Sequence, residues 1–154
     1  MHWYWIDRFT VFESGKRAQA VKAVTRAENH LHAHFKYHPI EPASLIIEGL
    51  AQTAGLLIGQ SKNYDAKVVL GKIPKIHFYV TEIVPGDVLT YDVAIDYVSE
   101  DGSMATVSAR RGDELVAEGS LVFAHLGAEF NNKKQFEDGA LEDLMRAYGM
   151  YEVG

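Results

Sequence analysis

The sequence predicts an α+β fold in which an antiparallel sheet wraps around one long central helix. Two observations carry this prediction. An almost wholly apolar helical segment begins at Ala43, and later segments with strand patterns are separated by hairpin turns at Asp101-Gly102 and Gly112-Asp113. A helix that precedes several antiparallel strands can be buried if the strands pack around it. With 154 residues, 47% of them hydrophobic and 23% charged, the chain is expected to form one globular core.

The N-terminal part of the chain predicts a hairpin followed by the helix. Residues 3–12 and 16–25 form its two arms, around a turn at Glu13-Ser14-Gly15. From Ala43 the apolar positions cover every face of a helix, which predicts a buried helix that ends between Gln60 and Asn63. Pro42 is compatible with the loop before this helix or with its first turn.

Four strands are predicted after the helix. The first spans residues 68–79 and contains Pro74, which favours an edge strand or a bulge. Pro85-Gly86 then forms a turn, and strands follow at 88–99, 103–111 and 114–125. In the strand 88–99, alternation places Leu89, Tyr91, Val93, Ile95 and Tyr97 on one face and Asp92 and Asp96 on the other.

The last 28 residues differ in character from the rest, so we divide the chain into a domain at 1–126 and a tail at 127–154. The tail begins as a polar loop. Asp138 can cap a short helix that Gly149 ends, with its apolar residues on one face: Leu141, Leu144, Met145 and Tyr148.

Composition excludes several functional classes. The net charge of −6 argues against a nucleic-acid-binding surface. There is no apolar run of about 18 residues that could span a membrane, and the aromatic start lacks the features of a signal peptide. The absence of cysteine excludes disulfides and thiolate catalysis. A cytoplasmic location is the expectation.

The candidate chemistry lies at the start of the apolar helix. His34 belongs to a loop, and Glu48 is the one carboxylate within the helix, with Gln52 one turn further on. A glutamate on an apolar helix is rarely buried without a partner. An imidazole titrates near neutral pH and can therefore act as a base. These residues are therefore a candidate acid/base pair.

A metal site is the alternative for this region. His30, His32 and His34 alternate, and an extended strand would project them to one face, with Glu28 and Glu41 available as further ligands. That arrangement would leave Glu48 without a role. We therefore expect neither a metal nor a cofactor.

The segment from His34 to Gln52, HFKYHPIEPASLIIEGLAQ, resembles the active-site signature of the β-hydroxyacyl-acyl carrier protein dehydratases of bacterial type II fatty-acid synthesis, which have the hot-dog fold. The spacing of 14 from His34 to Glu48 matches this signature without an insertion. The resemblance extends over roughly residues 3–126. Its weaker parts are Ile6-Asp7-Arg8, Glu13-Ser14-Gly15-Lys16-Arg17-Ala18, Val84-Pro85-Gly86-Asp87 and Leu115-Val116-Ala117-Glu118.

The resemblance implies a hydro-lyase that converts a 3-hydroxyacyl-acyl carrier protein to the trans-2-enoyl thioester without a cofactor. His34 would be the base and Glu48 the acid, contributed by two different chains of a homodimer. The N–H of Ala43 would polarise the thioester carbonyl, and Gln52 would steady Glu48. The partner is then an acyl carrier protein, and the assembly is at least a dimer, with a trimer of dimers common in the family.

Two departures mark the chain as a specialised relative of that family. Lys36-Tyr37 replaces Pro-Gly after the His-Phe pair, and Ala43-Ser44 stands where the signature has Gly and any residue. The acid at position 48 is Glu, as in the branch that only dehydrates; the branch that also isomerises the double bond carries Asp. Two other functions remain open, a hot-dog acyl thioesterase and a non-catalytic subunit that binds the acyl carrier. Acyl length and the particular carrier cannot be inferred from the sequence.

Overall fold

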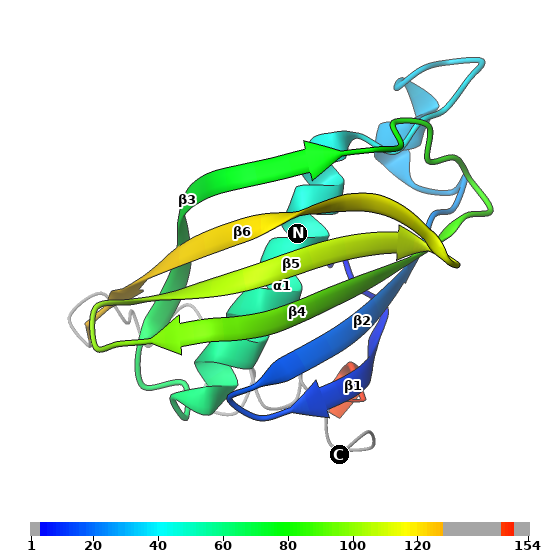
Figure 1. Cartoon of the computed structure of the whole chain (residues 1–154). Helices are drawn as coiled ribbons and strands as arrows, with labels where there is room; N and C mark the ends of the chain where they lie inside the picture. Colours follow the sequence, from blue (N-terminus) through cyan, green and yellow to red (C-terminus); the bar gives the residue numbers. More distant parts are fainter. Residues whose placement is uncertain (1–3, 128–145, 150–154) are drawn as a thin grey trace.

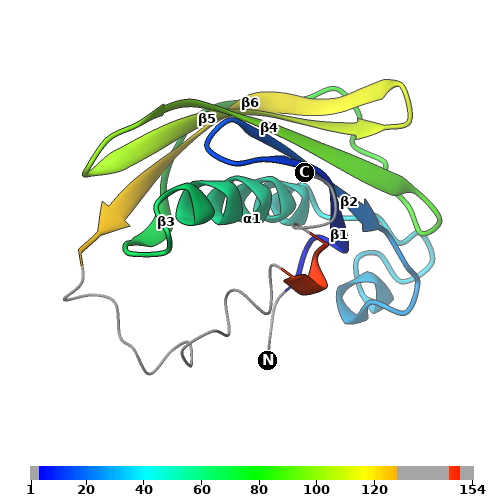
Figure 2. The same ribbon diagram turned by 90° about the horizontal axis from the view of Figure 1, so that it is seen from below.

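A six-stranded antiparallel sheet curves over one side of a long helix, α1 (Figures 1 and 2). The computed structural model describes residues 4–127 and 146–149. The strand order is β1-β2-β4-β5-β6-β3, so β1 and β3 form the two edges. The elements are β1 (Arg8–Glu13), β2 (Arg17–Ala23), the 3₁₀ helix η1 (Asn29–His32), α1 (Ala43–Ser61), β3 (Lys67–Phe78), β4 (Val88–Val98), β5 (Gly102–Arg111) and β6 (Glu114–Leu126). This arrangement confirms the predicted α+β fold.

Helix α1 has the predicted bounds. Pro42 precedes it in an extended conformation. Proline has no N–H, but at the start of a helix this removes no intrahelical hydrogen bond. The helix ends at Ser61, and the chain then turns away through Asn63 and Tyr64, both in the left-handed region.

The burial of α1 differs from the prediction. Its sheet side is buried, but on the opposite side a stripe spaced at i, i+3 and i+4 is only half-buried: Leu45, Glu48, Gln52 and Leu56. One layer of sheet cannot enclose a helix, so in the single chain α1 is buried on one side instead of all around. On the sheet side, Gly49 faces the ring of Tyr91, and a side chain at residue 49 would overlap that ring.

The strands follow the predicted order with two differences. β1 begins at Arg8 instead of residue 3, and the described residues 4–7 lie outside the strand. In β4 the alternation holds through Ile95, but the register against β5 shifts between Ile95 and Tyr97, and Tyr97 is exposed. Pro74 lies in edge strand β3, within a shift of its register against β6, as its sequence predicts.

Only the end of the predicted tail helix is described. Tyr148 is buried against Phe9 of β1, and its carbonyl accepts a hydrogen bond from the Phe9 N–H. Gly149 has the positive φ expected where a helix ends. Asp138, Leu141, Leu144 and Met145 lie outside the described residues, and the division at residue 126 stays a prediction. Within the described ranges, no helix has the length and apolarity needed to cross a membrane.

Candidate active site

His34 lies in a compact loop between η1 and α1. Its carbonyl accepts the N–H of Ile40 at 2.8 Å, and its ring Nδ1 lies 2.9 Å from the carbonyl oxygen of the same residue. Inside this closure, Phe35 and His38 exchange two backbone hydrogen bonds. The loop is therefore fixed by hydrogen bonds although most of its side chains are exposed.

The contact with Ile40 decides which nitrogen of His34 is basic. A carbonyl oxygen can only accept, so Nδ1 must carry the hydrogen. The lone pair of the neutral ring is then on Nε2. This is the tautomer that a general base needs, since its basic nitrogen is not occupied by the backbone.

Glu48 is held from the next turn of α1. The Gln52 amide donates from Nε2 to Glu48 Oε1 at 3.0 Å, and its Oε1 accepts the backbone N–H of Trp5 at 2.9 Å. The Trp5 N–H thus determines the orientation of the Gln52 amide, because only its oxygen can accept from a donor. Gln52 lies beside Glu48, as predicted.

Ala43 is exposed in the first turn of α1, and Pro42 provides no side-chain cap for the N–H groups of that turn. Such N–H groups are oriented donors at the positive end of the helix dipole. The single chain brings Glu48, Gln52 and Ala43 onto one helix, and it positions His34 in the preceding loop. Among the described residues of one chain, no hydrogen bond or ion pair joins His34 to Glu48.

Comparison with known proteins identifies the family. Residues 2–124 match the FabA-like domain. The 3-hydroxyacyl-[acyl-carrier-protein] dehydratase FabZ of Clostridioides difficile strain 630 is 36% identical over 120 residues, which are 77% of this chain and 84% of that protein. The enzyme of the same name from Fusobacterium nucleatum is 36% identical over 121 residues, 77% of this chain and 83% of the relative. The chain belongs to this dehydratase family.

Solved structures show that this family member shares its fold with both dehydratases and thioesterases. The dehydratase heterocomplex ApeI:P from Xenorhabdus doucetiae superposes with a TM-score of 0.70 at 14% identity, covering 86% of this chain and 89% of that one. A hypothetical thioesterase with coenzyme A from Streptococcus pneumoniae TIGR4 gives a TM-score of 0.62 at 12% identity, with coverages of 78% and 85%. At these identities the likeness establishes the hot-dog fold alone.

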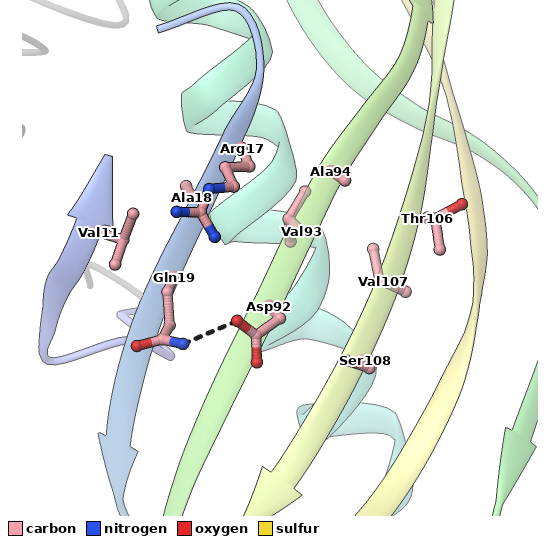
Figure 3. Close-up of a pocket in the computed structure, with 10 residues that line it drawn as sticks. All are labelled: Val11, Arg17, Ala18, Gln19, Asp92, Val93, Ala94, Thr106, Val107 and Ser108. Carbon is pink, nitrogen blue, oxygen red and sulfur yellow. Dashed lines mark hydrogen bonds between the residues drawn. The ribbon is translucent and has the colours of Figure 1, made fainter. Parts of the chain in front are cut away.

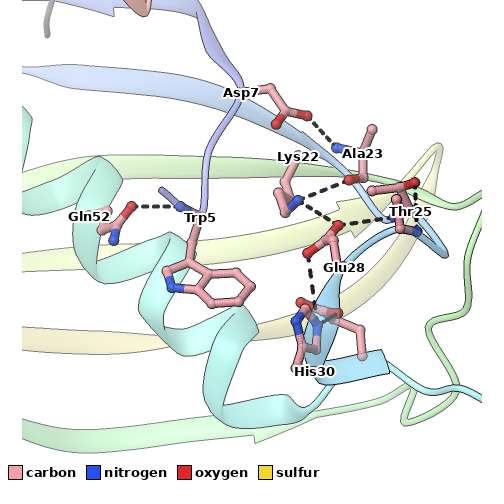
Figure 4. Close-up of polar contacts among 10 residues, drawn as sticks. Trp5, Asp7, Lys22, Ala23, Thr25, Glu28, His30 and Gln52 are labelled. Carbon is pink, nitrogen blue, oxygen red and sulfur yellow. Dashed lines mark hydrogen bonds and ion pairs between the residues drawn. The ribbon is translucent and has the colours of Figure 1, made fainter. Parts of the chain in front are cut away.

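A buried charged cluster in this FabA-like domain was not predicted. Lys22 Nζ lies 2.8 Å from Glu28 Oε1, and His30 Nε2 lies 2.7 Å from Glu41 Oε2 and 3.8 Å from Glu28 Oε2. Figure 4 shows Lys22, Glu28 and His30 converging beside Trp5. Glu41 is 2% exposed, and its burial raises its pKa, although His30 acts in the opposite direction.

The cluster contains three of the residues that the metal alternative considered, Glu28, His30 and Glu41. The ligand atoms of Glu28, His30 and Glu41 lie within 4.8 Å of one another, which is close enough for a metal ion. The Lys22 ammonium faces Oε1 of Glu28 in the same cluster. His32 is exposed and does not join this group. The feature of the sequence that could have indicated the cluster is Glu41, which lies between the apolar residues Ile40 and Pro42. A carboxylate that is buried in such a place needs a partner.

A hollow of about 250 Å³ lies on the outer side of the sheet, across β1, β2, β4 and β5 (Figure 3). Gln19 donates to Asp92 across its floor, at 2.8 Å. Because Gln19 and Asp92 alternate with the buried side chains of Ala18 and Val93, the hollow faces away from α1. It is therefore separated by the sheet from Glu48.

Proposed function

We propose that this chain dehydrates a 3-hydroxyacyl thioester on an acyl carrier protein to the trans-2-enoyl thioester, in fatty-acid biosynthesis in the cytoplasm. The observation that carries the proposal is the fixed tautomer of His34, which leaves a basic Nε2 on the family's catalytic motif. The curated relatives in this family are named as dehydratases of this substrate class.

His34 Nε2 would remove a proton from the α-carbon of the acyl chain. The electron pair of that C–H bond forms the new double bond to the β-carbon, while the β C–O bond breaks. Glu48 would give its proton to the departing hydroxyl, which leaves as water. The amide of Gln52 holds Oε1 of Glu48, so Oε2 is the oxygen available to carry this proton.

Negative charge builds on the thioester carbonyl as the α-proton leaves. The N–H of Ala43 would donate to this oxygen, supported by the helix dipole. The replacement of glycine by alanine at this position leaves the N–H in place, so this contact is compatible with the departure from the family signature.

The catalytic pair would form between two chains. Edge strand β3 exposes unpaired backbone together with apolar side chains, Leu70 at 39% and Ile73 at 38%. The outer stripe of α1 that contains Glu48 is also incompletely covered. A second copy that pairs along β3 would cover apolar surface and could bring its own His34 to Glu48. A trimer of dimers would extend this assembly without changing the shared site.

An acyl carrier protein is the proposed partner, and Lys36 is the proposed contact for its acidic surface. Lys36 is exposed two residues after His34, and its Nζ lies 5.4 Å from the ring centre of Tyr37. We expect Lys36→Glu to raise the KM for carrier-bound substrate by about 3–10-fold, because like charges would meet at the interface rim. The kcat/KM for a short N-acetylcysteamine thioester, which has no carrier, should not change.

Lys16→Glu is the matched control for this prediction. Lys16 lies in the β1–β2 turn, where Ser14 contacts Gln60 near the far end of α1. Ala43 and Gln60 are about 25 Å apart along the helix axis, so Lys16 is remote from the His34 loop. An equal rise in KM for both charge reversals would point to a general charge effect instead of a docking contact.

A product assay tests the function itself. The purified protein is incubated with carrier-bound 3-hydroxyacyl chains of several lengths, and the products are separated by mass. A product lighter than the substrate by one water per thioester supports dehydration. Release of the free hydroxy acid would support the thioesterase, and binding without any product would support a non-catalytic carrier-binding subunit.

A further inference from the structure

The N-terminal segment connects the helix that carries Glu48 to the segment that leads to His34 of the same chain, and in the proposed dimer these two residues serve different sites. The backbone N–H of Trp5 orients the Gln52 amide, which holds Glu48. The indole ring of the same residue packs edge-on against the His30 ring, with centroids 5.1 Å apart. Trp5 therefore contacts both the helix that carries Glu48 and the segment that leads to His34 (Figure 4).

His30 closes the loop that contains His34. Its Nε2 reaches Glu41 Oε2 at 2.7 Å, which joins a residue four positions before His34 to one seven positions after it. Glu41 directly follows Ile40, whose carbonyl holds the imidazole of His34. The Glu41 backbone is also fixed, since its N–H donates to the Ile83 carbonyl at 2.7 Å. The position of Ile40, and with it the His34 tautomer, therefore depends on how Glu41 is held.

The burial of the charged groups makes this contact strong. Glu41 is almost fully buried, and Lys22 lies mainly against Glu28, so His30 is the side chain in hydrogen-bond contact with the Glu41 carboxyl. Hydrogen bonds to ionised groups at low exposure are among the strongest in proteins. Removal of His30 leaves the Glu41 carboxyl buried without its hydrogen-bond partner.

We propose that Trp5, His30 and Glu41 form a positioning network that holds His34 and Glu48 in their reactive orientations. This inference rests on the proposed function for its effect on turnover, and on geometry alone for its effect on His34. None of the three side chains needs to touch the substrate. The His30 and Glu41 side chains fix the Ile40 carbonyl, the Trp5 indole packs on His30, and the Trp5 backbone N–H fixes the Gln52 amide.

Glu41→Ala is the primary test. We expect kcat for dehydration to fall by about 10–100-fold with KM within about twofold, because a small displacement of a catalytic group costs rate more than binding. Glu41→Gln keeps a hydrogen bond to His30 and should retain kcat within about threefold of the wild type. In the double variant Trp5→Ala/Glu41→Ala, the fold-loss in kcat should be smaller than the product of the fold-losses of the two single variants. Both substitutions remove contacts of the same network, so their effects should not be independent.

Ser103→Ala is the matched control. It removes a buried contact of the same kind, from Ser103 Oγ to His125 Nε2 at 3.0 Å, beside Lys62 at the far end of α1. This variant should lower the melting temperature without lowering kcat. A loss of kcat in Ser103→Ala as large as in Glu41→Ala would overturn the proposal, because the effect would then follow stability alone.

The imidazole ¹⁵N spectrum of His34, assigned with His34→Ala, separates this proposal from the proposed function. In the wild type it should report the tautomer with hydrogen on Nδ1, and in Glu41→Ala a mixture of tautomers. An unchanged spectrum and unchanged kcat in Glu41→Ala would refute the network while leaving dehydration intact. A changed spectrum in a protein without dehydratase activity would support the network and reject the function.

Discussion

Replacement of His34 by alanine or of Glu48 by glutamine is expected to lower kcat for dehydration by about 10²–10⁴-fold. This is the usual loss when a general acid or base is removed. His34→Ala removes the basic Nε2. Glu48→Gln keeps the shape and the contact from Gln52 but has no proton to give to the leaving hydroxyl. The measurement is single-turnover formation of the enoyl thioester from a carrier-bound hydroxyacyl chain.

His32→Ala is the matched control for the histidine. It lies two residues before His34, at the end of η1, and is exposed. Its activity should equal that of the wild type. Circular dichroism and gel filtration should be unchanged in all three variants, since the half-buried His34 and Glu48 are not part of the hydrophobic core. Near-normal turnover in both His34→Ala and Glu48→Gln would refute the assignment.

A mixture of the two inactive variants should regain activity. If His34 and Glu48 of one site come from different chains, a mixed dimer carries one site with both defects and one site with none. With random exchange of chains, half of the dimers are mixed, so about a quarter of the wild-type sites should return. The chains are unfolded together and refolded together, and the enoyl product is measured against each variant treated alone.

This experiment distinguishes a shared site from a site within one chain. When both groups belong to the same chain, every site in every mixture keeps a defect, and no activity returns. Light scattering on the same samples establishes whether dimers are present. A monomer at micromolar concentration would leave the shared site without a basis, even if single variants lose activity.

Much of the fold could be predicted from local patterns. The apolar run after Pro42 predicted α1 to within a residue or two, and Pro74 predicted an edge or bulged strand, since proline lacks the N–H that a central strand needs. The exposure of Tyr97 could not be predicted, because a bulge depends on the register against the neighbouring strand. The partial exposure of the outer stripe of α1 could not be predicted either, because the burial of a helix depends on how many layers of structure cover it.

The candidate site was predicted unevenly. The motif spacing identified His34, Ala43, Glu48 and Gln52, and their catalytic roles stay predictions. The partner of Gln52 could not be predicted, because it is a backbone N–H, which every residue except proline has, and Trp5 lies 47 residues away in the sequence. His30 and Glu41 were considered as metal ligands, and in the structure their side chains contact each other. Residue types alone do not distinguish a charged pair from a metal site.

The edge strand β3 has a consequence for how many copies can associate. An open strand edge invites addition of further chains without limit, which leads to fibres. Pro74 interrupts the row of N–H groups on this strand, and the exposed ammonium groups of Lys72 and Lys75 resist close stacking of many identical strands. Antiparallel pairing of two such strands about a two-fold axis uses β3 once in each chain and leaves no free β3 edge for a third chain.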